Sequence, residues 1–175
     1  ALAMSVKCIS IQNVDPRPEP AWGLLNATES LGAAAHIWTY GDLVYAMRDV
    51  GVEPIVTPES SPQEIAGAVK HKQDLVAALD AMTVCSFSSY AFSLDDYAAA
   101  LSLVTHTSWS PETLLDAGAR IVDLERQYNA ACGIGAAADT LPERFLKEPV
   151  PSGRHAGKVC DLQPMLQAYY ELRSW

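Results

Sequence analysis

The stretch from Pro62 to Phe87 reads PQEIAGAVKHKQDLVAALDAMTVCSF, and it begins with the clearest helical pattern in the chain. Pro62 suits the first turn of a helix, and Glu64 suits the same turn because a carboxylate is stabilised near a helix N-terminus. After Asp80 the composition changes to Thr, Val, Cys and Ser, which disfavours a continuing helix. The sequence therefore predicts a helix over roughly 62–79, with an apolar face formed by Ile65, Val69, Leu75, Val76 and Leu79.

Two chemically active side chains lie at the predicted end of this helix. Asp80 offers a carboxylate, and Cys85 offers a thiol five positions later. A turn that presents both groups can hold a cofactor, because carboxylates accept hydrogen bonds and thiolates bind metals. The alternative is a helix end followed by a buried free cysteine, since free cysteine is among the most buried residue types. The local sequence leaves both interpretations open.

Composition restricts the class of protein. The chain has 175 residues, of which 49% are hydrophobic and 19% charged, and this is typical of one globular domain with its own core. The net charge of −9 argues against a nucleic-acid partner, since a phosphate backbone requires a basic surface. No apolar run approaches the length of a membrane-spanning helix, and no basic-then-apolar segment indicates a signal peptide. We therefore expect a cytoplasmic protein without a membrane partner.

The four cysteines are far apart in the sequence and form no Cys-x-x-Cys pair. This spacing argues against a zinc site and favours reduced thiols. At most one of them is a ligand of a metal cluster, and one ligand cannot hold a cluster alone. The residues are Cys8, Cys85, Cys132 and Cys160.

The rest of the chain reads as mainly α-helical. Residues 4–14 alternate loosely and predict an extended segment or one edge strand. Ser110 followed by Pro111 and Glu112 predicts a helix that runs to about Ala131. Its apolar stripe includes Leu114, Leu124 and Tyr128, and Arg126 should face water. Shorter helices are predicted over 21–31, 42–50, from Ser93, from Asp139 and from Asp161 or Gln163. The prediction is an irregular, compact helical domain of six to seven helices with little strand.

His36 is a second candidate for chemistry. It follows Gly32 and three alanines, and such small residues let a ligand or another segment approach closely. Histidine titrates near neutral pH, so it suits proton transfer. A histidine that hydrogen-bonds a loop carbonyl is the alternative.

Three stretches of the C-terminal half resemble the C-terminal end of the aldehyde:ferredoxin oxidoreductases, which are tungsten or molybdenum pyranopterin enzymes. The block DTLPERFLKEP over residues 139–149 and the ending MLQAYYELRSW over 165–175 carry the resemblance, and ARIVDLERQYN over 119–129 is similar to the family's last long helix. The resemblance implies that residues 1–175 form a single domain like the last of the family's three domains. The pterin-cradling N-terminal domain and the middle domain are absent from this sequence.

The resemblance also implies roles for the residues at the helix end. In the family, the pattern Asp-x-x-Gly-Leu-Cys binds the pterin cofactor, and its cysteine is the fourth ligand of a [4Fe-4S] cluster. Here Asp80 and Cys85 keep their spacing, while Thr83 and Val84 replace Gly-Leu, although glycine tolerates positive φ and threonine does not. The three other cluster cysteines belong to an earlier domain of the family. His36 resembles a histidine near the metal, where it would contact substrate or move a proton.

The implied function is that of the C-terminal domain of an enzyme that oxidises an aldehyde to a carboxylic acid. Electrons would pass from a tungsten or molybdenum bis-pyranopterin through a [4Fe-4S] cluster to ferredoxin. We expect the chain alone to bind no cofactor and to be inactive. The alternative is a non-catalytic helical interaction module that kept the fold. An isolated last domain should expose an apolar patch and self-associate as a homo-oligomer. The substrate, and the choice between tungsten and molybdenum, do not follow from the sequence.

Overall fold

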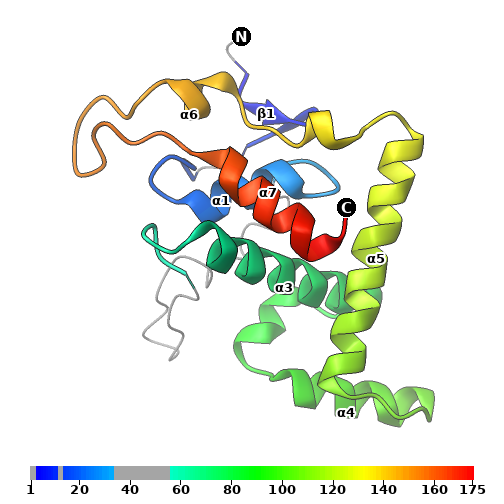
Figure 1. The fold of residues 1–175 in the computed structure, drawn as a ribbon. Helices are drawn as coiled ribbons and strands as arrows, with labels where there is room; N and C mark the ends of the chain where they lie inside the picture. Colours follow the sequence, from blue (N-terminus) through cyan, green and yellow to red (C-terminus); the bar gives the residue numbers. More distant parts are fainter. Residues whose placement is uncertain (1–2, 12–13, 34–55) are drawn as a thin grey trace.

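Six α-helices and one small hairpin make up the described part of the chain, which is residues 3–11, 14–33 and 56–175 of the computed structural model (Figure 1). The mainly α prediction is confirmed. None of the helices in these ranges is long and apolar enough to cross a membrane. The elements are β1 (Ser5–Val6), β2 (Ile9–Ser10), α1 (Pro20–Thr28), α3 (Pro62–Ala81), η3 (Ser86–Tyr90), α4 (Leu94–Thr105), α5 (Pro111–Ala131), η4 (Ala136–Ala138), α6 (Glu143–Lys147) and α7 (Leu162–Arg173), where η denotes a 3₁₀ helix.

Three helices begin at a capping box, in which the capping serine and the third helical residue satisfy each other's backbone N–H groups. At the start of α3, the Ser61 hydroxyl accepts from the Glu64 N–H, and Glu64 accepts from the Ser61 N–H at 2.7 Å. Ser93 and Ser110 cap α4 and α5 in the same way. The predicted helix starts after these residues are therefore confirmed. The helix predicted over 42–50 lies outside the described residues.

The N-terminal segment departs from the prediction of one edge strand. β1 and β2 form an antiparallel hairpin in which Val6 pairs with Ile9. The turn between them places Lys7 at φ 47° and Cys8 at φ 68°. Two-residue hairpin turns of this kind favour Asn-Gly or Asp-Gly, so Lys-Cys gave no turn signal in the sequence.

Helix α3 lies at the centre of the fold, with α1 and α7 packed along it and α5 crossing it (Figure 1). Its predicted face is largely buried, with Leu75 half-buried. On α5 the buried residues are Leu114, Gly118 and Val122, whereas Leu124 is 63% exposed and Tyr128 71% exposed. The prediction that these last two residues face the core is wrong. Helical spacing identified the apolar side of α5 but not how much of it other elements cover.

A buried polar network joins α3 to α7. Arg173 donates to the Asp74 carboxylate at 2.5 Å, and the two side chains are 1% and 5% exposed. Tyr169 donates to Gln73 at 2.5 Å and accepts from the Arg173 Nε at 3.0 Å. Gln73 in turn donates to the Thr28 hydroxyl of α1 at 3.2 Å. Each of these buried polar groups therefore has a partner, which is the condition for such a network to stabilise a fold.

A second buried network centres on Asp139, the first residue of the 139–149 block. Its carboxylate accepts from Arg126 of α5 and from the Tyr170 hydroxyl of α7, both at 2.6 Å. The Lys7 ammonium lies 2.8 Å from the other carboxylate oxygen, and it also donates to the carbonyls of Ala27 and Glu29 at the end of α1. The expectation that Arg126 faces water is therefore wrong, because this guanidinium pairs with a fully buried carboxylate.

Gly118 sets the distance between α3 and α5. A Cβ atom at this position would overlap the Asp74 carbonyl oxygen and lie 2.7 Å from the carbonyl carbon, well inside van der Waals contact. Only glycine lets the two backbones approach this closely. A Cβ added at Gly67, on α3, would meet no atom within 4 Å, so this glycine has no such role.

We predict opposite effects for alanine at these two glycines. Gly118→Ala should lower the free energy of unfolding by about 3 kcal/mol, because the helices must separate to admit the methyl group. Gly67→Ala should raise it by about 1 kcal/mol, because alanine favours a helix interior. Urea unfolding followed by circular dichroism measures both values. Equal effects of the two substitutions would contradict the close approach of α3 and α5.

Candidate functional site

The candidate site begins where α3 ends, and the end has a defined geometry. The Thr83 N–H donates to the Asp80 carbonyl at 2.9 Å, and the Val84 N–H donates to the Leu79 carbonyl at 3.1 Å. This pair of bonds is the Schellman motif, which satisfies the last carbonyls of a helix and reverses the chain. Val84 packs on the cluster that contains Leu79, as the motif requires. Asp80 is thus the second-last residue of the helix, and Cys85 follows the turn.

Thr83 occupies the position of this motif that usually belongs to glycine. Its φ is 57°, in the left-handed region that costs a residue with a Cβ roughly 1–2 kcal/mol. The turn therefore keeps the backbone conformation that glycine would give, in spite of the substitution. The Thr83 hydroxyl donates to the neighbouring Met82 carbonyl at 2.7 Å.

Cys85 is exposed at the surface, while its backbone carbonyl is hydrogen-bonded within the protein. The residue is exposed and stands immediately before η3. Its carbonyl accepts from the Ser88 N–H at 2.9 Å and from the Ser88 hydroxyl at 2.6 Å. The Ser88 hydroxyl lies 2.6 Å from the Tyr97 hydroxyl of α4, so α4 anchors the backbone beside the thiol. The alternative of a buried, inert Cys85 is wrong.

Cys160 shows the opposite environment. It is 2% exposed, and burial raises the pKa of its thiol to about 12. A thiol that does not ionise near neutral pH is a poor metal ligand. Cys8 and Cys132 are exposed, but each lies alone. Within the described ranges, no three His, Cys, Asp or Glu side chains are grouped so that they could hold a metal ion.

Asp80 lines a small cavity of about 150 Å³ on the side of α3 that faces α5. The cavity joins the end of α3 to the segment Glu29–Leu31, which leads directly into the stretch that contains His36. Asn129 of α5 fixes this segment by donating to the Ser30 carbonyl at 2.8 Å. The fold thus brings residues 29–31 beside Asp80. His36 itself lies outside the described residues.

Two acidic residues of this cavity escaped the sequence analysis. Glu29 is 8% exposed and Glu125 comes from α5, and both line the cavity with Asp80. Glu29 and Glu125 belong to no local sequence motif. They lie near Asp80 only because α1 and α5 pack on α3. The residues present fit part of a cofactor site: one accessible thiol, one carboxylate and a formed turn.

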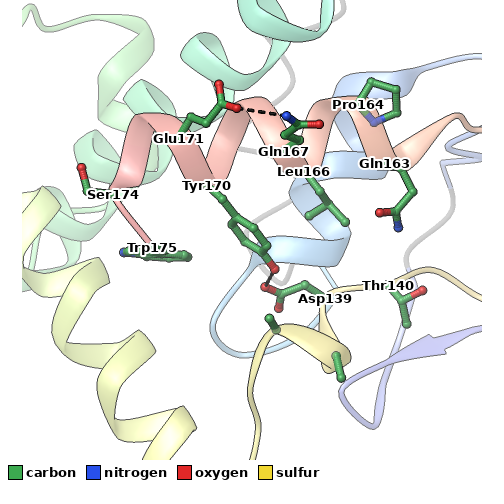
Figure 2. Close-up of a pocket in the computed structure, with 12 residues that line it drawn as sticks. Asp139, Thr140, Gln163, Pro164, Leu166, Gln167, Tyr170, Glu171, Ser174 and Trp175 are labelled. Carbon is green, nitrogen blue, oxygen red and sulfur yellow. Dashed lines mark hydrogen bonds between the residues drawn. The ribbon is translucent and has the colours of Figure 1, made fainter.

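A larger groove of about 740 Å³ lies elsewhere, between α7 and the segment around η4 (Figure 2). Figure 2 shows Tyr170 pointing to Asp139 at its base and Glu171 bonded to Gln167 along its edge. The Asp139 carboxylate is already paired with Lys7 and Arg126 and accepts a hydrogen bond from Tyr170. Its role is therefore structural. Burial and the adjacent Asp139 carboxylate raise the pKa of Tyr170 to about 12. The groove shares no lining residue with the Asp80 cavity.

Comparison with known proteins identifies relatives along the whole chain. The family described as aldehyde ferredoxin oxidoreductase, domains 2 & 3, matches residues 1–175. The tungsten-containing aldehyde ferredoxin oxidoreductase of Thermococcus kodakarensis is 36% identical over 174 residues, which are 99% of this chain and 28% of that protein. The proteins of the same name from Pyrococcus furiosus and Pyrococcus horikoshii are 33% and 35% identical over 99% and 98% of the chain. The chain spans 28% of the length of each of these relatives.

We predict that Thr83→Gly stabilises the chain. Glycine removes the cost of the left-handed conformation, so the free energy of unfolding should rise by about 1 kcal/mol. The measurement is urea unfolding, with Thr83→Ala as the control that removes the hydroxyl but keeps the Cβ. A glycine variant no more stable than the alanine variant would show that this position is not strained.

We also predict that Tyr170 makes stability depend on alkaline pH. The phenol stays protonated in the fold to about pH 12, whereas an unfolded tyrosine ionises near pH 10, so its contribution is complete below about pH 10 and is lost as pH rises toward 12. At neutral pH, Tyr170→Phe should cost about 1 kcal/mol for the lost hydrogen bond. The difference in unfolding free energy between wild type and variant should shrink between about pH 10 and 12. A constant difference would contradict the raised pKa.

Proposed function

The chain belongs to the aldehyde ferredoxin oxidoreductase family, and on that premise we propose that it is the C-terminal part of an enzyme that oxidises aldehydes to carboxylic acids. The geometry of residues 80–85 is the observation that carries the proposal. A carboxylate and an accessible thiol stand on either side of a helix-terminating turn, and the turn keeps its shape although threonine replaces glycine. The same turn ends α3 and determines where Cys85 follows Asp80, which supports a joint role for the two side chains.

Each residue of the turn has a proposed role. Asp80 accepts hydrogen bonds from the N–H groups of a pterin ring, because an ionised carboxylate is an acceptor with two oxygens. Cys85 supplies one thiolate ligand to a [4Fe-4S] cluster. Thr83 and Val84 hold these two groups in register by closing the Schellman motif. The remaining cluster ligands would come from other parts of the polypeptide, since no three His, Cys, Asp or Glu side chains of the described residues are grouped so that they could hold a metal.

A tungsten–pterin centre would supply the two-electron oxidation of an aldehyde and water to a carboxylate, and the cluster would pass the electrons singly to ferredoxin. The names of the relatives favour tungsten over molybdenum. By the family resemblance, His36 would hold or move a proton near the reacting oxygen. Ferredoxin, an aldehyde and the other domains of the enzyme are the proposed partners.

We predict that Cys85→Ala removes the cluster from the full-length enzyme. Without its fourth ligand the cluster should be lost or strongly depleted, which iron analysis and the visible absorbance of the purified protein measure. Cys132→Ala is the matched control, because Cys132 is also exposed but stands alone at the end of α5. Asp80→Asn should lower the pterin and tungsten content while leaving iron in place.

Unchanged iron in the Cys85→Ala enzyme would overturn the assignment. That result would favour the alternative function, a helical interaction module that kept the fold without the cofactor. Loss of iron in both cysteine variants would indicate a general folding defect, which the melting temperature of each variant detects.

A further inference from the structure

Helix α4 carries an exposed apolar face that the described fold does not cover. Of its twelve residues only Tyr97 and Ala98 are buried, whereas Leu103 is 77% exposed and Val104 79% exposed. Tyr97, Leu101 and Val104 share a helix face by their spacing, but Tyr97 is buried, Leu101 is half-buried and Val104 is exposed. Figure 1 shows the reason: α4 lies at one end of the molecule, where it packs against α5.

The exposed residues form one surface by helical geometry. Ala99 lies four positions before Leu103, and Ala100 lies three before Leu103 and four before Val104, which places the members of each pair side by side on the helix. Phe92, which immediately precedes the capping residue Ser93, is a further exposed apolar residue at 55%, and its ring packs edge-on against Tyr97 at 6.2 Å. We call Phe92, Ala99, Ala100, Leu103 and Val104 the α4 surface. Beyond its first turn α4 has no charged residue, whereas a helix face in contact with water normally carries charges.

Stability also indicates that α4 has a partner. A helix of twelve residues is marginal in water and depends on packing of its apolar face. Two side chains of α4 are buried, and Leu94 and Leu101 pack half-buried against the cluster that contains Leu79, so the packing of α4 within the described fold is limited to one side of the helix. The same helix anchors the backbone of Cys85 through the contact between Ser88 and Tyr97. The helix that carries the α4 surface is therefore linked to the backbone of the candidate site through Tyr97.

Two partners could cover the α4 surface: a second copy of this chain or the rest of the enzyme polypeptide. The distribution of charge favours the second. Between Gln73 and Ala119 the sequence contains no Lys or Arg, whereas Asp95, Asp96, Glu112 and Asp116 fall within this stretch. Two copies of the chain that met through their α4 surfaces would bring acidic groups together without a cation from this stretch. A partner with an apolar centre and a neutral or basic rim fits better. The remainder of the enzyme polypeptide is available, since the chain spans only 28% of its relatives.

We propose that the α4 surface is the docking face for the rest of the enzyme's own polypeptide, and that this contact holds Cys85 against the segment that provides the other cluster ligands. The inference rests on the proposed function in taking the chain as one part of a longer enzyme. Beyond that function, α4 is the helix that makes the contact, and its partner presents an apolar centre with a neutral or basic rim.

Hydroxyl-radical footprinting of the full-length enzyme tests this proposal. Mass spectrometry gives the oxidation rates of Phe92 and Leu103, each normalised to the same side chain in denatured enzyme. In the monomeric fraction both should be oxidised many-fold more slowly than in the denatured enzyme, as for fully buried residues. Rates close to the denatured values would overturn the proposal, and so would protection that appears only in a dimeric fraction.

A pair of variants gives a second readout. Leu103→Asp in the full-length enzyme should lower the melting temperature by several degrees, while Leu172→Asp, at a 48% exposed leucine of α7, should change it less. Equal shifts would contradict the proposal. If Leu103→Asp does not fold, the footprint of the unmodified enzyme still decides. The cofactor assignment can fail separately, because iron retained by Cys85→Ala would refute the ligand role without altering the footprint.

Discussion

The buried ion pair between Arg173 and Asp74 is the contact on which the rest of this fold depends. Asp74 lies in the middle of α3, where its side chain holds α7 and its carbonyl receives the backbone of α5 at Gly118. Lys70 also pairs with Asp74, at 2.8 Å. Removing the Asp74 carboxylate would leave the buried Arg173 charge without its counter-ion, which typically costs about 3–5 kcal/mol. Burial alone would lower the pKa of Arg173, but Tyr169 and Asp74 outweigh it and leave the pKa raised, so the guanidinium stays charged. Contacts at Asp74 thereby hold α3, α5 and α7 in place relative to one another.

This constraint explains how the candidate site is positioned. Once α3 is fixed by α5 and α7, its last turn has one direction, and the Schellman motif determines where the chain goes next. Asp80 then faces the cavity beside the Glu29–Leu31 segment, and Cys85 emerges on the surface next to α4. The packing of α3 therefore fixes where both candidate residues lie relative to the end of this helix.

Much of the fold could be predicted from local sequence, because serine caps, N-terminal prolines and helical periodicity are short-range signals. They placed the starts of α3, α4 and α5 and the end of α3 near Asp80. Contacts between distant segments could not be predicted in this way. Arg126 appeared to be a surface residue because its partner Asp139 comes from another element, and Glu125 joined the Asp80 cavity only through helix packing. Leu124 and Tyr128 belong to the predicted apolar stripe of α5 although both are exposed, because periodicity does not distinguish a buried apolar face from an exposed one.

Anomalous diffraction from crystals of the full-length enzyme, collected at the iron and tungsten absorption edges, tests the central claim most directly. The account predicts iron density bonded to the Cys85 sulfur, and tungsten density with its pterin on the side of the turn where Asp80 lies. Metal peaks remote from both residues, with the end of α3 facing solvent, would contradict it.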